Sequence, residues 1–134
     1  MSLRPSNPFA NVIMELLDRV ECLYMDVKNG NMLSEAIDGE LASIIRMLGV
    51  NLRTASLGIS SLKEIRDVVE YGRSILILAY NKDLITDEIF QKNVLSLSKV
   101  LKSCETLPNS FVNDLILSLD DILKMQAESV NSLD

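Results

Sequence analysis

The sequence of 134 residues contains no histidine. This absence excludes Ser-His-Asp and Cys-His nucleophilic arrangements, zinc sites built from Cys and His, and di-iron bundles built on Glu-x-x-His. The only two cysteines are too few for a structural zinc site of their own or for the disulfide framework of a small secreted protein. We therefore expect no catalytic residue, no metal site and no cofactor, and we predict that the protein is not an enzyme.

Long apolar runs are absent as well. The longest is residues 75–80, and six residues are far short of the roughly 20 that a membrane-spanning helix needs. Residues 1–6 are polar, contain Pro5 and lack the apolar region of a secretory signal. We therefore predict a cytoplasmic location and no membrane association.

Tryptophan is missing and aromatic residues make up only 4% of the chain, although hydrophobic residues make up 48%. Leu, Ile, Val and Met must therefore fill the core. These side chains, with only 5 Gly and 3 Pro, favour helices joined by short loops. The length suits one domain. The composition predicts an all-α, single-domain bundle.

Apolar periodicity divides this bundle into about five helices. Asn7 and Pro8 suit the start of the first, and Asn29-Gly30 suits its end. The second begins at Ser34 or Asp38, and we expect Gly49 to end it, with residues 50–60 as a connector. The first helix carries a broad apolar stripe of Phe9, Val12, Ile13, Leu16, Leu17, Val20, Leu23, Tyr24 and Val27.

The third helix is predicted over residues 62–81, at the centre of the bundle. Ser61 and Glu64 form a capping box at its start. Gly72 lies in its apolar seam, which indicates a closely approaching neighbour. Its last turns, residues 75–80, are apolar on every side, and such a helix is expected to be buried on every side.

Thr86 is expected to cap the fourth helix and Leu107-Pro108 to end it. The fifth opens at Asn109 or Ser110. We divide the chain into a flexible leader (1–6), the helical domain (7–128) and a frayed tail (129–134). The inner seam predicted for the fourth helix is Phe90, Val94, Leu97, Leu101 and Cys104.

Spaced carboxylates offer one chemical hypothesis. Asp18-x-x-Glu21 and Glu64-x-x-Asp67-x-x-Glu70 place acids one helical turn apart, as magnesium-binding helical pyrophosphatases do, and so suggest a magnesium-dependent nucleotide hydrolase. The two groups are far apart in sequence, and Asp18 points away from the apolar stripe. Solvent-exposed helix faces explain these residues better.

Basic residues gather in the middle of the chain. The formal net charge is −6, yet residues 46–102 carry nine basic and six acidic side chains. Arg46, Arg53, Lys63, Arg66 and Arg73 are candidates for a phosphate-contacting stripe, and Arg66 and Arg73 share a face. Intramolecular ion pairing is the competing explanation, and no aromatic pair is interleaved for base stacking.

Apolar residues outside the core stripes are the third signal. Met14, Cys22 and Met25 lie on the outward side of the first helix, Leu95 on that of the fourth and Leu117 on that of the fifth. Methionine is common at adaptable binding surfaces. We interpret these five residues as a candidate interface with a protein partner or a second copy, and we expect a homodimer.

Three functions follow from these signals. The favoured one is a non-catalytic interaction or assembly module. The alternative is a small helical subunit of a nucleoprotein complex that uses the basic central segment. The weakest is the magnesium-dependent hydrolase. The sequence thus predicts a protein partner and leaves nucleic acid as the less favoured one.

Overall fold

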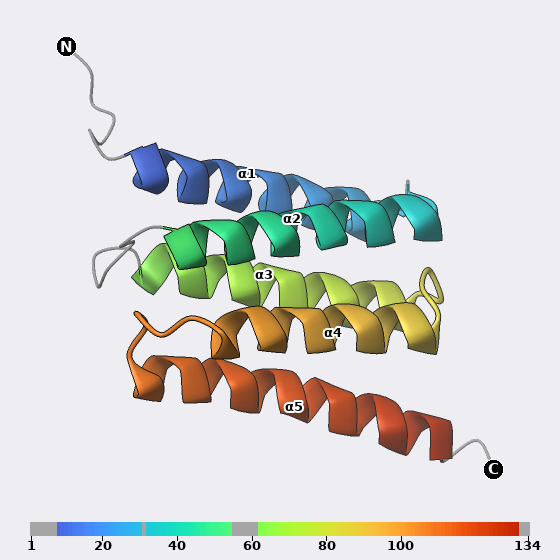
Figure 1. Ribbon diagram of the computed structural model, residues 1–134. Helices are drawn as coiled ribbons and strands as arrows, with labels where there is room; N and C mark the ends of the chain where they lie inside the picture. Colours follow the sequence, from blue (N-terminus) through green and yellow to red (C-terminus); the bar gives the residue numbers. More distant parts are fainter. Residues whose placement is uncertain (1–7, 31, 55–61, 132–134) are drawn as a thin grey trace.

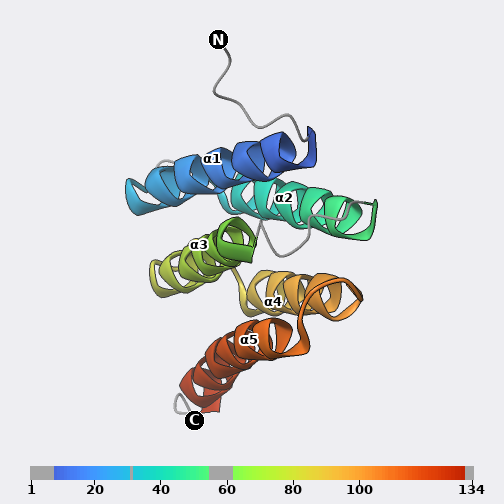
Figure 2. The same ribbon diagram turned by 90° about the vertical axis from the view of Figure 1, so that its left-hand side faces the viewer.

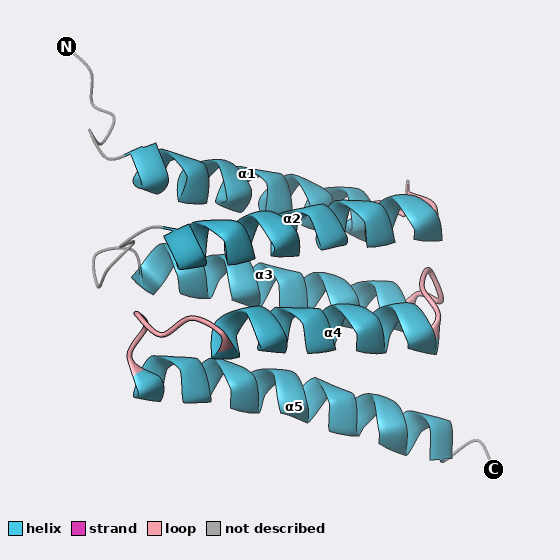
Figure 3. Ribbon diagram, viewed as in Figure 1, coloured by secondary structure: helices cyan, strands magenta, loops and turns pink. Residues whose placement is uncertain are grey.

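The computed structural model describes residues 8–30, 32–54 and 62–131, and these residues form five helices (Figure 3). The prediction of an all-α, single-domain bundle of about five helices is confirmed. None of the described helices has both the length and the apolar content that crossing a membrane requires. The helices are α1 (Pro8–Lys28), α2 (Ser34–Thr54), α3 (Leu62–Asn81), α4 (Asp87–Lys102) and α5 (Asn109–Asn131).

Successive helices reverse direction along the chain (Figure 1). As a result, α1, α3 and α5 run one way, and α2 and α4 run the other way. Figure 2 shows α1 at one end of the stack and α5 at the other, with α2 and α4 on one side and α3 on the opposite side. α2 and α4 are therefore parallel neighbours, although they are not consecutive in the chain.

The third helix lies at the centre, as predicted. It contacts α1, α4 and α5, and Ile65, Val69 and Leu76 are fully buried in the shared core. Its last turns differ from the expectation in one respect, because Ile77 and Leu78 are only half-buried. One side of α3 faces away from the other helices (Figure 2). The apolar residues 75–80 are therefore not buried on every side.

The second helix is longer than predicted, and the expectation that Gly49 ends it is wrong. α2 continues to Thr54, so residues 50–54 are helical, and Leu52 is buried in the core. Gly49 is itself buried, and a Cβ atom at this position would lie 3.1 Å from Cγ2 of Val100. The glycine therefore serves the contact with α4 and does not mark a helix end. The remainder of the predicted connector, 55–60, lies outside the described residues.

Several helix ends agree with the predicted signals. The amide of Ile89 donates to Oγ1 of Thr86, which caps α4, and Gly30 adopts a φ of 72° after α1. α4 ends at Lys102, earlier than expected, and α5 extends to Asn131, into the predicted tail. Ser61 and residues 1–7 and 132–134 lie outside the described part of the chain.

Alanine at the two interior glycines of α2 is expected to have unequal effects. Gly39→Ala should raise the free energy of unfolding by about 0.5–1 kcal/mol, because alanine has the higher helix propensity. Nothing lies within 4 Å of a Cβ at Gly39, and the added methyl is therefore accommodated freely. Gly49→Ala should gain less, because Val100 must move. Urea denaturation measures both values, and an equal or larger gain at Gly49 would contradict this account of the α2–α4 contact.

Candidate functional site

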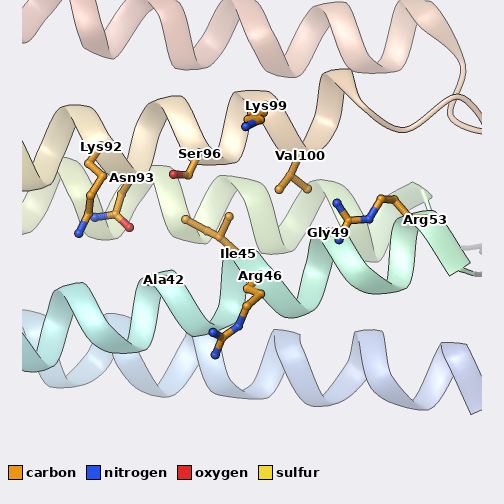
Figure 4. Close-up of a pocket in the computed structure, with 10 residues that line it drawn as sticks. All are labelled: Ala42, Ile45, Arg46, Gly49, Arg53, Lys92, Asn93, Ser96, Lys99 and Val100. Carbon is orange, nitrogen blue, oxygen red and sulfur yellow. The ribbon is translucent and has the colours of Figure 1, made fainter.

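A groove of about 410 Å³ lies between the parallel helices α2 and α4 (Figure 4). Apolar atoms form its floor: Ile45 is buried, and Val100 points toward Gly49. We call this feature the basic groove. Its lining residues are Ala42, Ile45, Arg46, Gly49 and Arg53 from α2, and Lys92, Asn93, Ser96, Lys99 and Val100 from α4.

Four cationic side chains line the basic groove, and none of its lining residues is acidic. Arg46 and Arg53 come from α2, and Lys92 and Lys99 come from α4. Within the described residues, Arg46, Arg53 and Lys99 form no ion pair. The groove therefore combines an apolar floor with uncompensated positive charge, which favours an anionic ligand or partner.

A polar cluster joins the two helices at one end of the basic groove. Asp38 of α2 accepts hydrogen bonds from Lys92 Nζ at 2.7 Å and from Asn93 Nδ2 at 3.0 Å. The hydrogen bond from Lys92 lowers the pKa of Asp38, against the opposing effect of burial. Asn93 is buried and also donates to the carbonyl oxygen of Ile89 at 2.8 Å. These contacts fix the positions of α2 and α4 relative to each other.

At the opposite end of the contact between α2 and α4, Cys104 forms a hydrogen bond with α2. Its Sγ donates to the carbonyl oxygen of Leu52 at 3.5 Å, which ties the chain after α4 to the last turn of α2. The cysteine is buried, as predicted from the inner seam of α4. Together with Gly49 at the centre, the two end contacts define the groove along its length.

The outward residues predicted on α1 gather on one exposed face. Met14 and Met25 are each 50% exposed, and Cys22 is exposed. Met14 and Met25 are eleven residues apart, about three helical turns, so they project in nearly the same direction. Asp18 and Glu21 lie between them on that face and are exposed. We call these five residues the acidic ridge.

The other two apolar candidates lie elsewhere. Leu95 is exposed on α4 between Lys92 and Lys99, three residues after the first and four before the second. It therefore shares the helix face that borders the basic groove. Leu117 is exposed on the outer face of α5, away from the residues that line the groove. The five predicted interface residues thus occupy three separate surfaces.

Arg66 and Arg73, the candidate phosphate contacts, both turn toward α5. The guanidinium carbon of Arg66 lies 5.1 Å from the ring centroid of Phe111, within the range of a cation–π interaction. Nε of Arg73 donates to the carbonyl oxygen of Ser118 at 3.1 Å. Both arginines therefore have partners within the bundle. These partners are an aromatic ring and a backbone carbonyl instead of the expected carboxylates.

Sequence reasoning missed the lysines that complete the basic groove. Arg46 and Arg53 were recognised as basic candidates, but they were grouped with residues of α3. Lys92 and Lys99 repeat the same seven-residue spacing on α4. That repeated spacing was the available signal, because residues seven apart lie on one helix face.

The spaced carboxylates do not come together. Asp18 and Glu21 are on the acidic ridge, whereas Asp67 of α3 forms an ion pair with Lys63 at 3.3 Å. Among the described residues, no three Cys, Asp or Glu side chains are close enough to hold a metal ion together.

Comparisons with known proteins add no relative. The chain matches no protein-family model, no curated protein and no solved structure.

Removing the carboxylate of Asp38 is expected to destabilise the bundle in a pH-dependent way. Asp38→Ala should lower the free energy of unfolding by about 1 kcal/mol at neutral pH, because it removes two hydrogen bonds. A lowered native pKa stabilises the fold above the unfolded value of about 3.9, and this contribution is lost as pH falls through the native value. Urea denaturation at neutral pH and at about pH 3 should therefore show a difference that shrinks in acid.

The matched control is Asp114→Ala, because Asp114 is exposed and has no ion pair within the described residues. Its effect should stay within about 0.5 kcal/mol at either pH. A difference between wild type and Asp38→Ala that is constant over this pH range would show that the carboxylate charge does not hold the two helices together.

Proposed function

We propose that the protein is a non-catalytic helical assembly module that associates with a second copy through exposed outer helix faces. The observation that carries the proposal is the acidic ridge, where Met14 and Met25 leave half of their surface in water. Methionine side chains adapt to irregular partner surfaces. A cytoplasmic location fits the proposal, because both cysteines are free thiols.

The fold does not need the apolar residues of the ridge. α1 already buries a complete stripe against its neighbours, and Met14, Cys22 and Met25 lie on the opposite side of the helix. Burying a methionine fully is worth about 1.5–3 kcal/mol, so a partner that covers two of them gains appreciable free energy. The buried stripe consists of Ile13, Leu16, Val20, Leu23 and Val27.

A second function is supported by the basic groove. Four cations around one groove suit the phosphates of a nucleic acid, so the protein is alternatively a small helical subunit of a nucleoprotein complex. This candidate now depends on Arg46, Arg53, Lys92 and Lys99, because Arg66 and Arg73 are engaged with α5. The apolar floor and the absence of any aromatic residue from the lining favour a protein partner over bases.

Substituting the ridge methionines is expected to abolish self-association. Light scattering on the size-exclusion peak in reducing buffer should give a mass above the 14.9 kDa of one chain. The double variant Met14→Lys with Met25→Lys should return to the monomer mass, because two ammonium groups cannot be buried in an apolar contact. Its thermal unfolding should remain close to that of wild type, since both side chains point away from the core.

Met125→Lys provides the control, because Met125 is 56% exposed on α5 and lies outside the ridge. This variant should keep the mass of wild type. A wild-type protein that stays monomeric at every accessible concentration would refute self-association. In that case, binding of labelled single-stranded RNA or DNA that is lost in Arg46→Glu with Lys99→Glu would support the second function instead.

A further inference from the structure

We infer that the basic groove of one copy receives the acidic ridge of another, so that the bundle assembles head to tail through two different surfaces. This inference deepens the proposed self-association by naming the contact that produces it. It depends on three observations: the charges of the two surfaces, their lengths, and their separate positions on the molecule.

The charges of the two surfaces are opposite and, apart from that of Lys92, which pairs with Asp38, they form no ion pair among the described residues. Glu15, Asp18, Glu21 and Asp26 are exposed on α1, and within the described residues none of them forms an ion pair. The nearby cation Arg19 is drawn away from them, because its guanidinium binds Glu40 and Ser43 of α2. The ridge is therefore free to attract the uncompensated cations of a second groove.

The lengths of the two surfaces also correspond. Met14 and Met25 are eleven residues apart, as are Ala42 and Arg53 at the two ends of the groove on α2. Both separations are about 16.5 Å at a rise of about 1.5 Å per residue. A helix laid along the groove would place Asp18 and Glu21, which lie between its two methionines, beside the cations at the rims of the groove, and its methionines toward the two ends. Such alignment of opposite charges favours this pairing of surfaces.

The outer face of α5 is the competing acidic surface. It carries Asp114, Asp120 and Asp121 around the exposed Leu117. However, Lys124 follows Leu117 by seven residues and so lies on the same face, where it would meet the cations of the groove. The corresponding cation of α1 is Lys28, which follows Glu21 by seven residues but lies in the last turn, beyond Met25. No cation lies between Met14 and Met25 on the outward face of α1, which makes α1 the better occupant.

The positions of the two surfaces decide the type of assembly. The ridge residues are exposed on α1, opposite the stripe that this helix buries, whereas the groove lies between α2 and α4. Figure 2 shows α1 at one end of the stack of helices. One copy therefore cannot fill its own groove. Because the contact joins two different patches, it is heterologous, and it generates closed rings or open chains.

Complementary charge reversal provides the test. Asp18→Lys with Glu21→Lys reverses the charge of the ridge and leaves the groove unchanged. Arg46→Glu with Lys99→Glu reverses the charge of the groove and leaves the ridge unchanged. All four residues are exposed and form no ion pair among the described residues, so both variants should fold with thermal midpoints near that of wild type. Each variant alone should weaken self-association about tenfold or more, measured by sedimentation or light scattering. Mixing the two should restore the heavier species, because each supplies the surface that complements the other.

Salt and a matched variant complete the test. Raising the ionic strength from about 0.05 M to about 0.5 M should shift wild type toward the monomer, because the rim charges become screened. Asp120→Lys with Asp121→Lys makes the same charge change on α5 and should leave the wild-type mass unchanged. An assembly that tolerates both variants and salt would overturn the groove contact and leave self-association standing. Loss of assembly only in the α5 variant would show that α5, and not α1, occupies the groove. Loss of RNA binding in Arg46→Glu with Lys99→Glu, without any change in mass, would show that the groove binds nucleic acid instead.

Discussion

The close approach of α4 to α2 at Gly49 is the contact on which the candidate site depends. Two parallel helices meet where one of them lacks a side chain, and Val100 packs so closely that a Cβ atom at Gly49 would lie 3.1 Å from its Cγ2. The contacts of Asp38 with Asn93 and of Cys104 with Leu52 hold the same pair of helices at either end. The groove is therefore a consequence of how these two helices are joined, because its floor and both walls belong to them.

Parallel packing also explains why positive charge gathers in an acidic protein. The C-terminal ends of α2 and α4 lie at the same end of the bundle, and each end carries a partial negative charge from the helix dipole. Arg53, Lys99 and Lys102 are in these last turns. Their charges stabilise the helix ends, and the side chains are still available to a partner at the surface. At exposed helix ends this stabilisation is at most about 1 kcal/mol per charge, so the same cations are available for the proposed contact at little cost to folding.

The sequence was sufficient for features that depend on local periodicity. The five helices and the central place of α3 follow from apolar spacing, and Thr86 caps α4 as its side chain predicts. Gly49 was misread because a glycine that ends a helix and one that admits a neighbour look identical in a single sequence. The groove was missed for a related reason: nothing in the spacing of either helix says that α2 and α4 are neighbours, so Arg46 and Lys99 could not be placed together.

Separating the core from the outer surfaces has a consequence for how such a module evolves its contacts. The buried stripe of α1 is complete without Met14 or Met25, and the α2–α4 contact is complete without Arg46 or Lys99. Substitutions at these exposed positions therefore change association at little cost to folding. A heterologous contact adds a further constraint, because a change on the ridge must be matched on a different helix pair. Charge complementarity eases that constraint, since long-range attraction requires less exact geometry than apolar packing does.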